Sequence, residues 1–282
     1  MEAEIGMKLK IFKPLWGHVG SLEIAVKQAI DAAFDGIEGP VPEDEGESER
    51  LGLLLRENDL GLIAEVTTGG GYVPNPNASP GIHLDDLRRG IERSLDHAPL
   101  FVNTQAGLDA WSFPTQVNFH ERIVELEREY GIPISVETHR SRSTFHPWIT
   151  RDLLQAVPDL KITCDFSHWC CVSERLVMDD DGELLAFVAS RCRHVHARVG
   201  YDQGPQVPDP RAPEYSDEVR RHRAWWDVIW ESRSENDESI MSMTPEFGTD
   251  GYLHLQPYTR KPVADLWEIN RWMGSQLREW YG

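Results

Sequence analysis

The feature of this sequence that most limits its fold is a regular alternation between short β-rich runs and longer amphipathic stretches across its 282 residues. This alternation is typical of βα units arranged around a parallel sheet. The predicted strands cover residues 8–13, 36–38, 60–66, 100–104, 133–137, 160–165, 194–199 and 239–245. The predicted helices cover residues 21–34, 45–58, 84–97, 115–130, 148–157, 182–190, 215–232 and 263–281.

Eight strands and eight helices in a chain of this length indicate an α/β fold, a single (βα)8 TIM barrel. An open, doubly wound sheet is the alternative, but the glycine fingerprint of dinucleotide binding is missing after the first strand, where the chain reads KPLWGH from residue 13. The three glycines at 69–71 lack the Lys-Ser/Thr of a phosphate loop and are expected to form a flexible loop. We therefore predict one barrel domain over residues 1–282, with residues 1–6 as a short N-terminal extension and the active site at the C-terminal ends of the strands.

The charge and composition of the chain exclude several classes of protein. Lys and Arg number 28 against 47 Asp and Glu, a formal net charge of −19, whereas a broad hold on nucleic acid needs a basic face. No run approaches the roughly 18 to 20 apolar residues that span a bilayer, and the first seven residues do not resemble a secretory signal. We expect a cytoplasmic protein that binds neither membrane nor nucleic acid, with its four cysteines, clustered between 164 and 192, reduced and packed.

The last four predicted strands each end at a residue that commonly binds metal ions. These residues are Glu137, Asp165, His196 and Glu246. Because the strand ends of a barrel meet at one mouth, three carboxylates would converge there and repel each other, and a divalent cation would relieve the repulsion. One imidazole and three carboxylates suit Mn²⁺ or Mg²⁺, and Zn²⁺ and Co²⁺ stay open as alternatives.

The motifs around these residues are VETH at 136–139, DFSH at 165–168, HVHAR at 194–198 and PEFG at 245–248. In order and spacing they resemble the xylose isomerase-like TIM barrel superfamily, of the sugar phosphate isomerase/epimerase type, whose members include ketose 3-epimerases, inosose dehydratase and the endonuclease IV type of phosphodiesterase. The resemblance runs from Met7 to the C-terminus. It implies that Glu137, Asp165, His196 and Glu246 bind one divalent metal ion, with Mn²⁺ expected, and that His168 lies beside the substrate.

Two carboxylates on either side of a metal-chelated α-hydroxycarbonyl can take a proton from one carbon and return it elsewhere while the metal stabilises the enediolate. Glu137 and Glu246 are the expected acid/base pair as well as ligands, as in the ketose epimerase branch. His168 is expected to polarise a substrate oxygen, and a buried capping histidine is its alternative reading.

The HVHAR motif holds two histidines on one face of the strand, so alternation does not choose between them. His196 lies nearer the C-terminal end and matches the family position, which leaves His194 as a barrel-interior residue or a partner of the ligand. Arg198 shares this face and would grip a substrate oxygen or carboxylate, or else form a salt bridge to the strand-end acids. The epimerases carry their substrate arginine further along this loop, where this chain has Tyr201 and Asp202.

Further residues at or just past strand ends are candidates for hydroxyl binding or ring stacking. They are Trp16, His18, Glu65, Gln105, His139 and Trp169. The proline-rich loop at 200–214 is predicted to be a shaped lid or substrate wall, with an inserted surface loop as the alternative. The tryptophan-rich segment at 224–230 forms either a core face or an interface patch, so assembly into a homo-oligomer is left open.

These observations favour a metal-dependent isomerase or epimerase of a small sugar or polyol-derived carbonyl compound, with a role in carbohydrate metabolism. The alternative is a lyase or dehydratase that uses the same proton abstraction to expel a β-leaving group from a keto-sugar, keto-inositol or keto-glycoside. A phosphodiesterase needs further metal ligands and a basic surface, which the net charge of −19 disfavours. A sugar-binding barrel without turnover has no need of Glu137 and Glu246.

Overall fold

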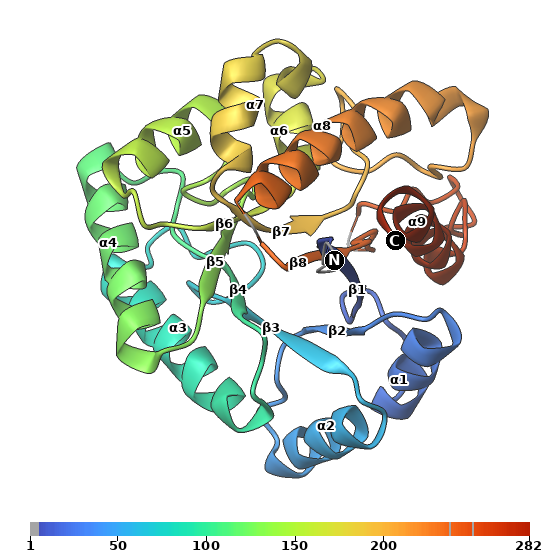
Figure 1. Cartoon of the computed structure of the whole chain (residues 1–282), viewed down its shortest axis with the longest axis horizontal. Coiled ribbons are helices and arrows are strands. Elements are labelled where there is room, and N and C mark those ends of the chain that lie inside the picture. Colours follow the sequence, from blue (N-terminus) through green and yellow to red (C-terminus); the bar gives the residue numbers. More distant parts are fainter. Residues whose placement is uncertain (1–5, 237, 250) are drawn as a thin grey trace, which may run out of the picture.

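The computed structural model describes residues 6–236, 238–249 and 251–282. Parallel strands close into a barrel in chain order from β1 to β8, and helices surround it (Figure 1). The barrel closes where β1 pairs with β8, with Leu9 opposite Met241. This arrangement confirms the predicted (βα)8 TIM barrel. Of the predicted N-terminal extension, residues 1–5 lie outside the described residues.

The strands agree with the prediction in number and order. They are β1 (Lys8–Pro14), β2 (Gly36–Gly39), β3 (Gly61–Thr67), β4 (Val102–Gln105), β5 (Ile134–Glu137), β6 (Ile162–Cys164), β7 (Cys192–His196) and β8 (Ile240–Thr244). β7 departs most from the prediction of 194–199. The amide of Ala197 still bonds the carbonyl of Thr244 at the end of β8, but further along the chain the carbonyl of Val199 accepts from the amide of Val207 in the following loop. The strand therefore ends at a predicted metal ligand.

The helices begin at clear signals in the sequence. They are α1 (Leu22–Asp31), α2 (Glu45–Glu57), α3 (Pro80–Ser94), α4 (Phe113–Tyr130), α5 (Pro147–Ala156), α6 (Phe166–Ser173), α7 (Gly182–Ala189), α8 (Ser216–Glu235) and α9 (Leu266–Tyr281), with 3₁₀ turns at Leu95–His97, Val177–Asp179 and Pro213–Tyr215. The side chains of Asp44, Ser112 and Asp265 accept hydrogen bonds from the first turns of α2, α4 and α9. α4 ends at Gly131, whose φ of 63° suits glycine.

The interior of the barrel is apolar at one end and polar at the other. Phe12, Ile63 and Phe101 form a small apolar cluster inside it, separate from the main core between strands and helices. Asn103 and Glu137, further along the strands, are both buried. The polar end is the end at which the strands finish, and this is where the candidate site lies.

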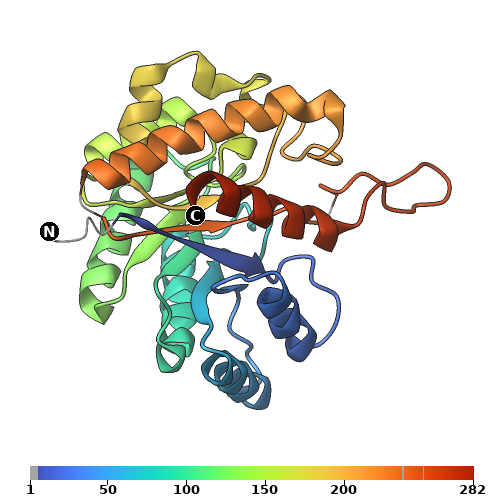
Figure 2. The same ribbon diagram turned by 45° about the vertical axis from the view of Figure 1, so that its right-hand side comes forward.

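The tryptophan-rich segment lies in α8, at the periphery of the barrel. In the tryptophan-rich segment Trp225 and Trp226 are buried, which agrees with a core face, and Trp230 stacks on Tyr281 with ring centroids 4.9 Å apart. Figure 2 shows the segment between β8 and α9 extending beyond the end to which β1 points. None of the helices in the described part of the chain combines the length and apolarity that a membrane span requires.

Candidate metal centre and active site

Four acidic and imidazole side chains meet at the C-terminal mouth of the barrel. Glu137 is the last residue of β5, His196 is the last residue of β7, and Asp165 and Glu246 follow the ends of β6 and β8. One ligand atom from each lies within 4.8 Å of the others, and all four residues are buried. The strand ends thus bring together the set that the sequence predicts.

The atoms at the centre of this set fit a divalent cation. Oε1 of Glu137 and Nδ1 of His196 are buried and have no hydrogen-bond partner in the described chain. Nδ1 of His196 lies 2.8 Å from Oε2 of Glu246 and 3.7 Å from Oε1 of Glu137. Buried polar atoms are rarely left without a partner, and a carboxylate oxygen beside an imidazole nitrogen is a common donor pair for a metal ion.

The other ring nitrogen of His196 belongs to a hydrogen-bonded chain that runs along the barrel interior. Nε2 of His196 lies 3.0 Å from one carboxylate oxygen of Glu38, and the other oxygen lies 3.2 Å from Nε2 of His194. Nδ1 of His194 lies 2.8 Å from the hydroxyl of Ser242. A carboxylate behind a ligating histidine fixes the ring and its tautomer. We call Ser242, His194, Glu38 and His196 the interior chain.

The excess of acids perturbs the protonation of the site. Burial lowers the pKa of His196, but the charges of Glu246, Glu38 and Glu137 outweigh burial and hold it well above its usual range. Burial and the charge of Glu137 raise the pKa of Glu246 to about 7. Burial and the charges of Glu246, Glu137 and Glu38 raise the pKa of Glu65 to about 8. Without a metal ion, the site therefore retains protons near neutral pH.

Arg198 supplies a positive charge to the same cluster. Its Nη2 forms an ion pair with Asp165 and lies 2.7 Å from Nε2 of His168, and its Nε donates to the hydroxyl of Ser167 at 3.0 Å. The side chain is almost fully buried. Of the two roles considered for Arg198, the structure shows the salt bridge to a strand-end acid.

A cavity of about 330 Å³ opens above the cluster. Its lining includes residues predicted for catalysis or substrate contact, namely Trp16, Glu65, Gln105, Glu137, His139, Arg198 and Glu246. Nε2 of Gln105 donates to Oε2 of Glu137 at 3.1 Å, while Oε1 of Gln105 has no partner among the described residues. The cavity is large enough for a small ligand and presents polar groups beside the metal-ligand set.

No protein-family model and no curated protein matches the sequence. Among solved structures, the probable 3-DHS dehydratase AsbF of Bacillus anthracis is 16% identical, with a TM-score of 0.63 over 96% of this chain and 99% of that chain. A xylose isomerase-like TIM barrel protein of Mycobacterium smegmatis in complex with magnesium is 12% identical, with a TM-score of 0.63 over 97% and 98% of the two chains.

A third structure, the 3-keto-D-glucoside 4-epimerase of E. coli in its apo form, is 14% identical, with a TM-score of 0.60 over 96% of this chain and all of that chain (100%). The chain has the xylose isomerase-like TIM-barrel fold. At these sequence identities the similarity establishes only the fold of the barrel. The assignment of the metal-ligand set is based on the distances between its residues.

The xylose isomerase-like barrel of this chain carries an aromatic roof over its cavity, which we define as Trp16, Tyr72 and Tyr252. Trp16 meets Tyr252 edge to face at 4.9 Å between ring centroids, and the hydroxyls of Tyr72 and Tyr252 form a hydrogen bond. Guanidinium carbon Cζ of Arg198 lies 4.8 Å from the Tyr252 ring centroid. The sequence analysis missed both tyrosines, which sit several residues past the strands, although their glycine-rich neighbourhoods are a signal for loops at this mouth.

Two predicted substrate contacts of this xylose isomerase-like barrel are corrected by the structure. Trp169 is fully buried, and its Nε1 donates to the carbonyl of Thr144 at 2.9 Å, because α6 starts directly after Asp165 and turns this side chain into the core. His18 does not line the cavity, and its Nε2 lies 3.1 Å from the carbonyl of Ser21 before α1.

His168 and the proline-rich loop also lie outside the cavity lining. The His168 ring packs against His139 with centroids 4.0 Å apart, and its Nε2 lies 4.0 Å from Oε1 of Glu137. Burial first, and then the charges of surrounding cations, hold the pKa of His168 well below its usual range, so the ring is neutral. In the loop, Gln206 accepts a hydrogen bond from the amide of Gly248 at 2.8 Å, so the loop supports the mouth from outside.

Proposed function

We propose that the chain is a divalent-metal-dependent isomerase or epimerase of a small sugar or polyol-derived carbonyl compound. This proposal is based on four side chains whose ligand atoms lie within 4.8 Å of one another beside a cavity, namely Glu137, Asp165, His196 and Glu246. Two of these atoms, Oε1 of Glu137 and Nδ1 of His196, have no hydrogen-bond partner in the described chain. Mn²⁺ is the ion that we propose, and the magnesium in the Mycobacterium smegmatis structure supports an ion of similar ligand preference.

The same four residues would hold the ion, which when bound would polarise the oxygens of an α-hydroxycarbonyl substrate. Glu137 and Glu246 would move the proton, because their carboxylates face the same cavity. Burial raises the pKa of Glu137, but the charge of His196 outweighs burial and lowers the pKa to about 2, so this group is an ionised carboxylate in the ion-free site. In the ion-free site the pKa of Glu246 is raised to about 7, and as a metal ligand this side chain would lose its proton and become the carboxylate that accepts the substrate proton.

Elimination is the second candidate, and Glu65 is the residue that favours it. This half-buried carboxyl lines the cavity, and in the ion-free site burial and the charges of Glu246, Glu137 and Glu38 raise its pKa to about 8. A protonated carboxyl beside the substrate can donate to a departing oxygen, a step that a dehydratase requires and a simple epimerase does not. The structural likeness to a probable dehydratase is consistent with this route.

Metal analysis of the protein purified without chelators is the first test, beside a Glu137→Ala/Glu246→Ala double variant. We expect about one divalent ion per chain, lost in the variant. Ketoses, inososes and keto-glycosides can then be screened for solvent deuterium uptake, and a product lighter by water would select the lyase. If no ion binds even in excess Mn²⁺, both candidate functions fail together.

The role of Glu246 has its own test. The Glu246→Gln variant keeps the shape of the side chain and removes its proton-accepting carboxylate, so turnover on an identified substrate should fall by about 10²–10⁴-fold. Circular dichroism should report an unchanged fold. Activity equal to that of the unaltered chain would contradict the acid/base assignment.

A further inference from the structure

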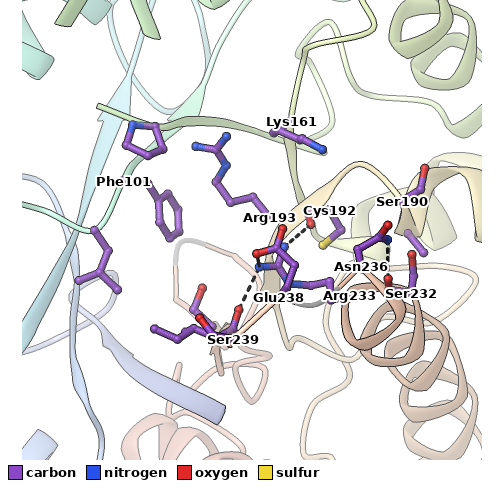
Figure 3. Close-up of a pocket in the computed structure, with 15 residues that line it drawn as sticks. Phe101, Lys161, Ser190, Cys192, Arg193, Ser232, Arg233, Asn236, Glu238 and Ser239 are labelled. Atoms are coloured by element: carbon purple, nitrogen blue, oxygen red, sulfur yellow. Dashed lines mark hydrogen bonds and ion pairs between the residues drawn. The ribbon is translucent and has the colours of Figure 1, made fainter. Parts of the chain in front are cut away.

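A second cavity, of about 690 Å³, lies where the strands begin, at the end of the barrel opposite the candidate active site. α7 and α8 end beside it, and Figure 3 shows Phe101 on one side and Ser190 and Ser232 on the other. The cavity shares no lining residue with the catalytic cavity. The proposed function therefore leaves it unexplained.

Cationic side chains gather at this cavity although the chain as a whole has a charge of −19. Those that line it are Lys161, Arg193 and Arg233 (Figure 3). Within the described chain their acidic partners are Glu127, 3.4 Å from Arg193, and Glu238, 3.5 Å from Arg233. Both ion pairs are long, and Lys161 makes none there. Among the described residues that line the cavity, three cationic side chains therefore stand against one acid, Glu238.

Arg233 has a structural role that explains its position beside the cavity. It donates to the carbonyls of Cys192 at 2.7 Å and Ile240 at 2.9 Å, and so joins the starts of β7 and β8. Lys161 and Arg193 have no comparable task. In the part of the chain that the structure describes, Nη1 of Arg193 is buried without a hydrogen-bond partner.

Like charges repel one another at this mouth, and among the described residues Glu238 offsets only part of that repulsion. Burial, followed by the positive charges of Arg191 and Arg193, lowers the pKa of Lys161. An anion between these groups would relieve their repulsion, as a cation would relieve that of the carboxylates at the other mouth. The side chain of Arg193 is only 19% exposed, which strengthens its interaction with a bound charge.

We propose that this cavity binds a small organic anion that carries a phosphate or a similar dianionic oxyanion group. A guanidinium fork and an ammonium group complement the oxygens of such an anion, and they come from Arg193 and Lys161. The hydroxyls of Ser232 and Ser239 are further donors at the same wall. The exposed Ile240, with the edge of the largely buried Phe101, supplies an apolar surface for the organic part of the ligand.

Calorimetric titration of the full chain with phenyl phosphate and with inorganic phosphate tests this site. We expect saturable binding of both, with phenyl phosphate bound more tightly because its ring packs on Ile240 and the edge of Phe101. The Lys161→Gln and Arg193→Gln variants should each bind about tenfold more weakly, which is the effect of losing about one charge-assisted hydrogen bond. Binding should also weaken as ionic strength rises.

Arg50→Gln is the matched control, because Arg50 lies on α2 and pairs with Glu23 away from the cavity. This variant should bind both probes like the unaltered chain. If Lys161→Gln does not fold, Lys161→Met retains the aliphatic stem and takes its place. Absence of saturable binding, or equal affinity in all variants, would overturn the site. Inorganic phosphate bound as tightly as phenyl phosphate would overturn its assignment to an organic anion.

Discussion

Glu38 has a single carboxylate that serves two histidines at the centre of the barrel. Its oxygens lie 3.0 Å from Nε2 of His196 and 3.2 Å from Nε2 of His194, and Asn103 donates to it at 3.2 Å. The group is only 3% exposed, so these contacts take place at low effective dielectric. Glu38 therefore orients the imidazole of the metal-ligand set without belonging to that set.

Replacement of Glu38 by glutamine tests this orienting role. The amide keeps the volume of the side chain and loses the charge that holds His196, so affinity for a divalent ion should fall about 10–100-fold. Competition with a chelating dye measures the affinity, and Glu43→Gln, at an exposed position, is the control. An affinity equal to that of the unaltered chain would show that Glu38 does not orient the ligand.

Metal binding should release protons. In the protein without an ion, the charges of the neighbouring carboxylates hold the pKa of His196 above its usual range, and the pKa of Glu246 is raised to about 7. A ligand must be deprotonated, so affinity should increase as pH rises through these pKa values and then level off. Calorimetry in buffers of different ionisation enthalpy should detect at least one proton released per ion near neutral pH. An ion that binds with no proton released would contradict the stated protonation.

The sequence predicts individual site residues most reliably where a metal-binding residue type stands at the end of a predicted strand. Glu137, Asp165, His196 and Glu246 satisfy both conditions, and the structure brings them together. The sequence did not predict Glu38 as a site residue, because a single acidic residue at the end of a short strand is equally typical of a helix cap. The partners of a long side chain such as Arg198 depend on distances that only the folded barrel supplies.

Among the elements, the segment after β6 shows how one residue can serve two purposes. Asp165 caps α6 by accepting from the amide of Ser167 at 3.0 Å, and it also belongs to the metal-ligand set. The sequence analysis did not predict α6, because FSHWCCVS lacks the polar face that reveals a helix by its periodicity. The strands were easier to predict, since β-rich runs of a buried parallel sheet contrast with amphipathic helices.

Gly248, after β8, makes room for the aromatic roof. A Cβ at this position would overlap the six-membered ring of the Trp16 indole. Gly248→Ala should therefore lower the free energy of unfolding by about 1–3 kcal/mol, as overpacked substitutions do. Thermal denaturation measures the change. In a Trp16→Ala background the same substitution should have little effect, and an equal loss in both backgrounds would place the strain elsewhere.

At the scale of the whole molecule, the metal-ligand set joins consecutive strands of one half of the barrel. Its members come from β5 to β8, and β8 closes on β1. A bound ion would therefore link four strands that hydrogen bonds already hold in register. The roof, by contrast, comes from loops after β1, β3 and β8.

Removal of metal should lower thermal stability. An ion present at about 100 times its dissociation constant contributes about 2.7 kcal/mol, which corresponds to roughly 5–10 °C in Tm for a chain of this size. Scanning calorimetry with and without a chelator should show this decrease, and added metal should reverse it. The Glu137→Ala/Glu246→Ala variant should not respond, and a similar decrease in that variant would assign the effect to another ion.

The interior chain of Ser242, His194, Glu38 and His196 limits which side chains of the barrel can be substituted independently. Each member satisfies the next, so a change at one position leaves a buried group without its partner at another. For protein engineering these four positions are one unit to be kept, while the roof residues, which contact one another, form a second unit that can be varied together. A library that varies Trp16, Tyr72 and Tyr252 is therefore the shortest route to a new substrate preference.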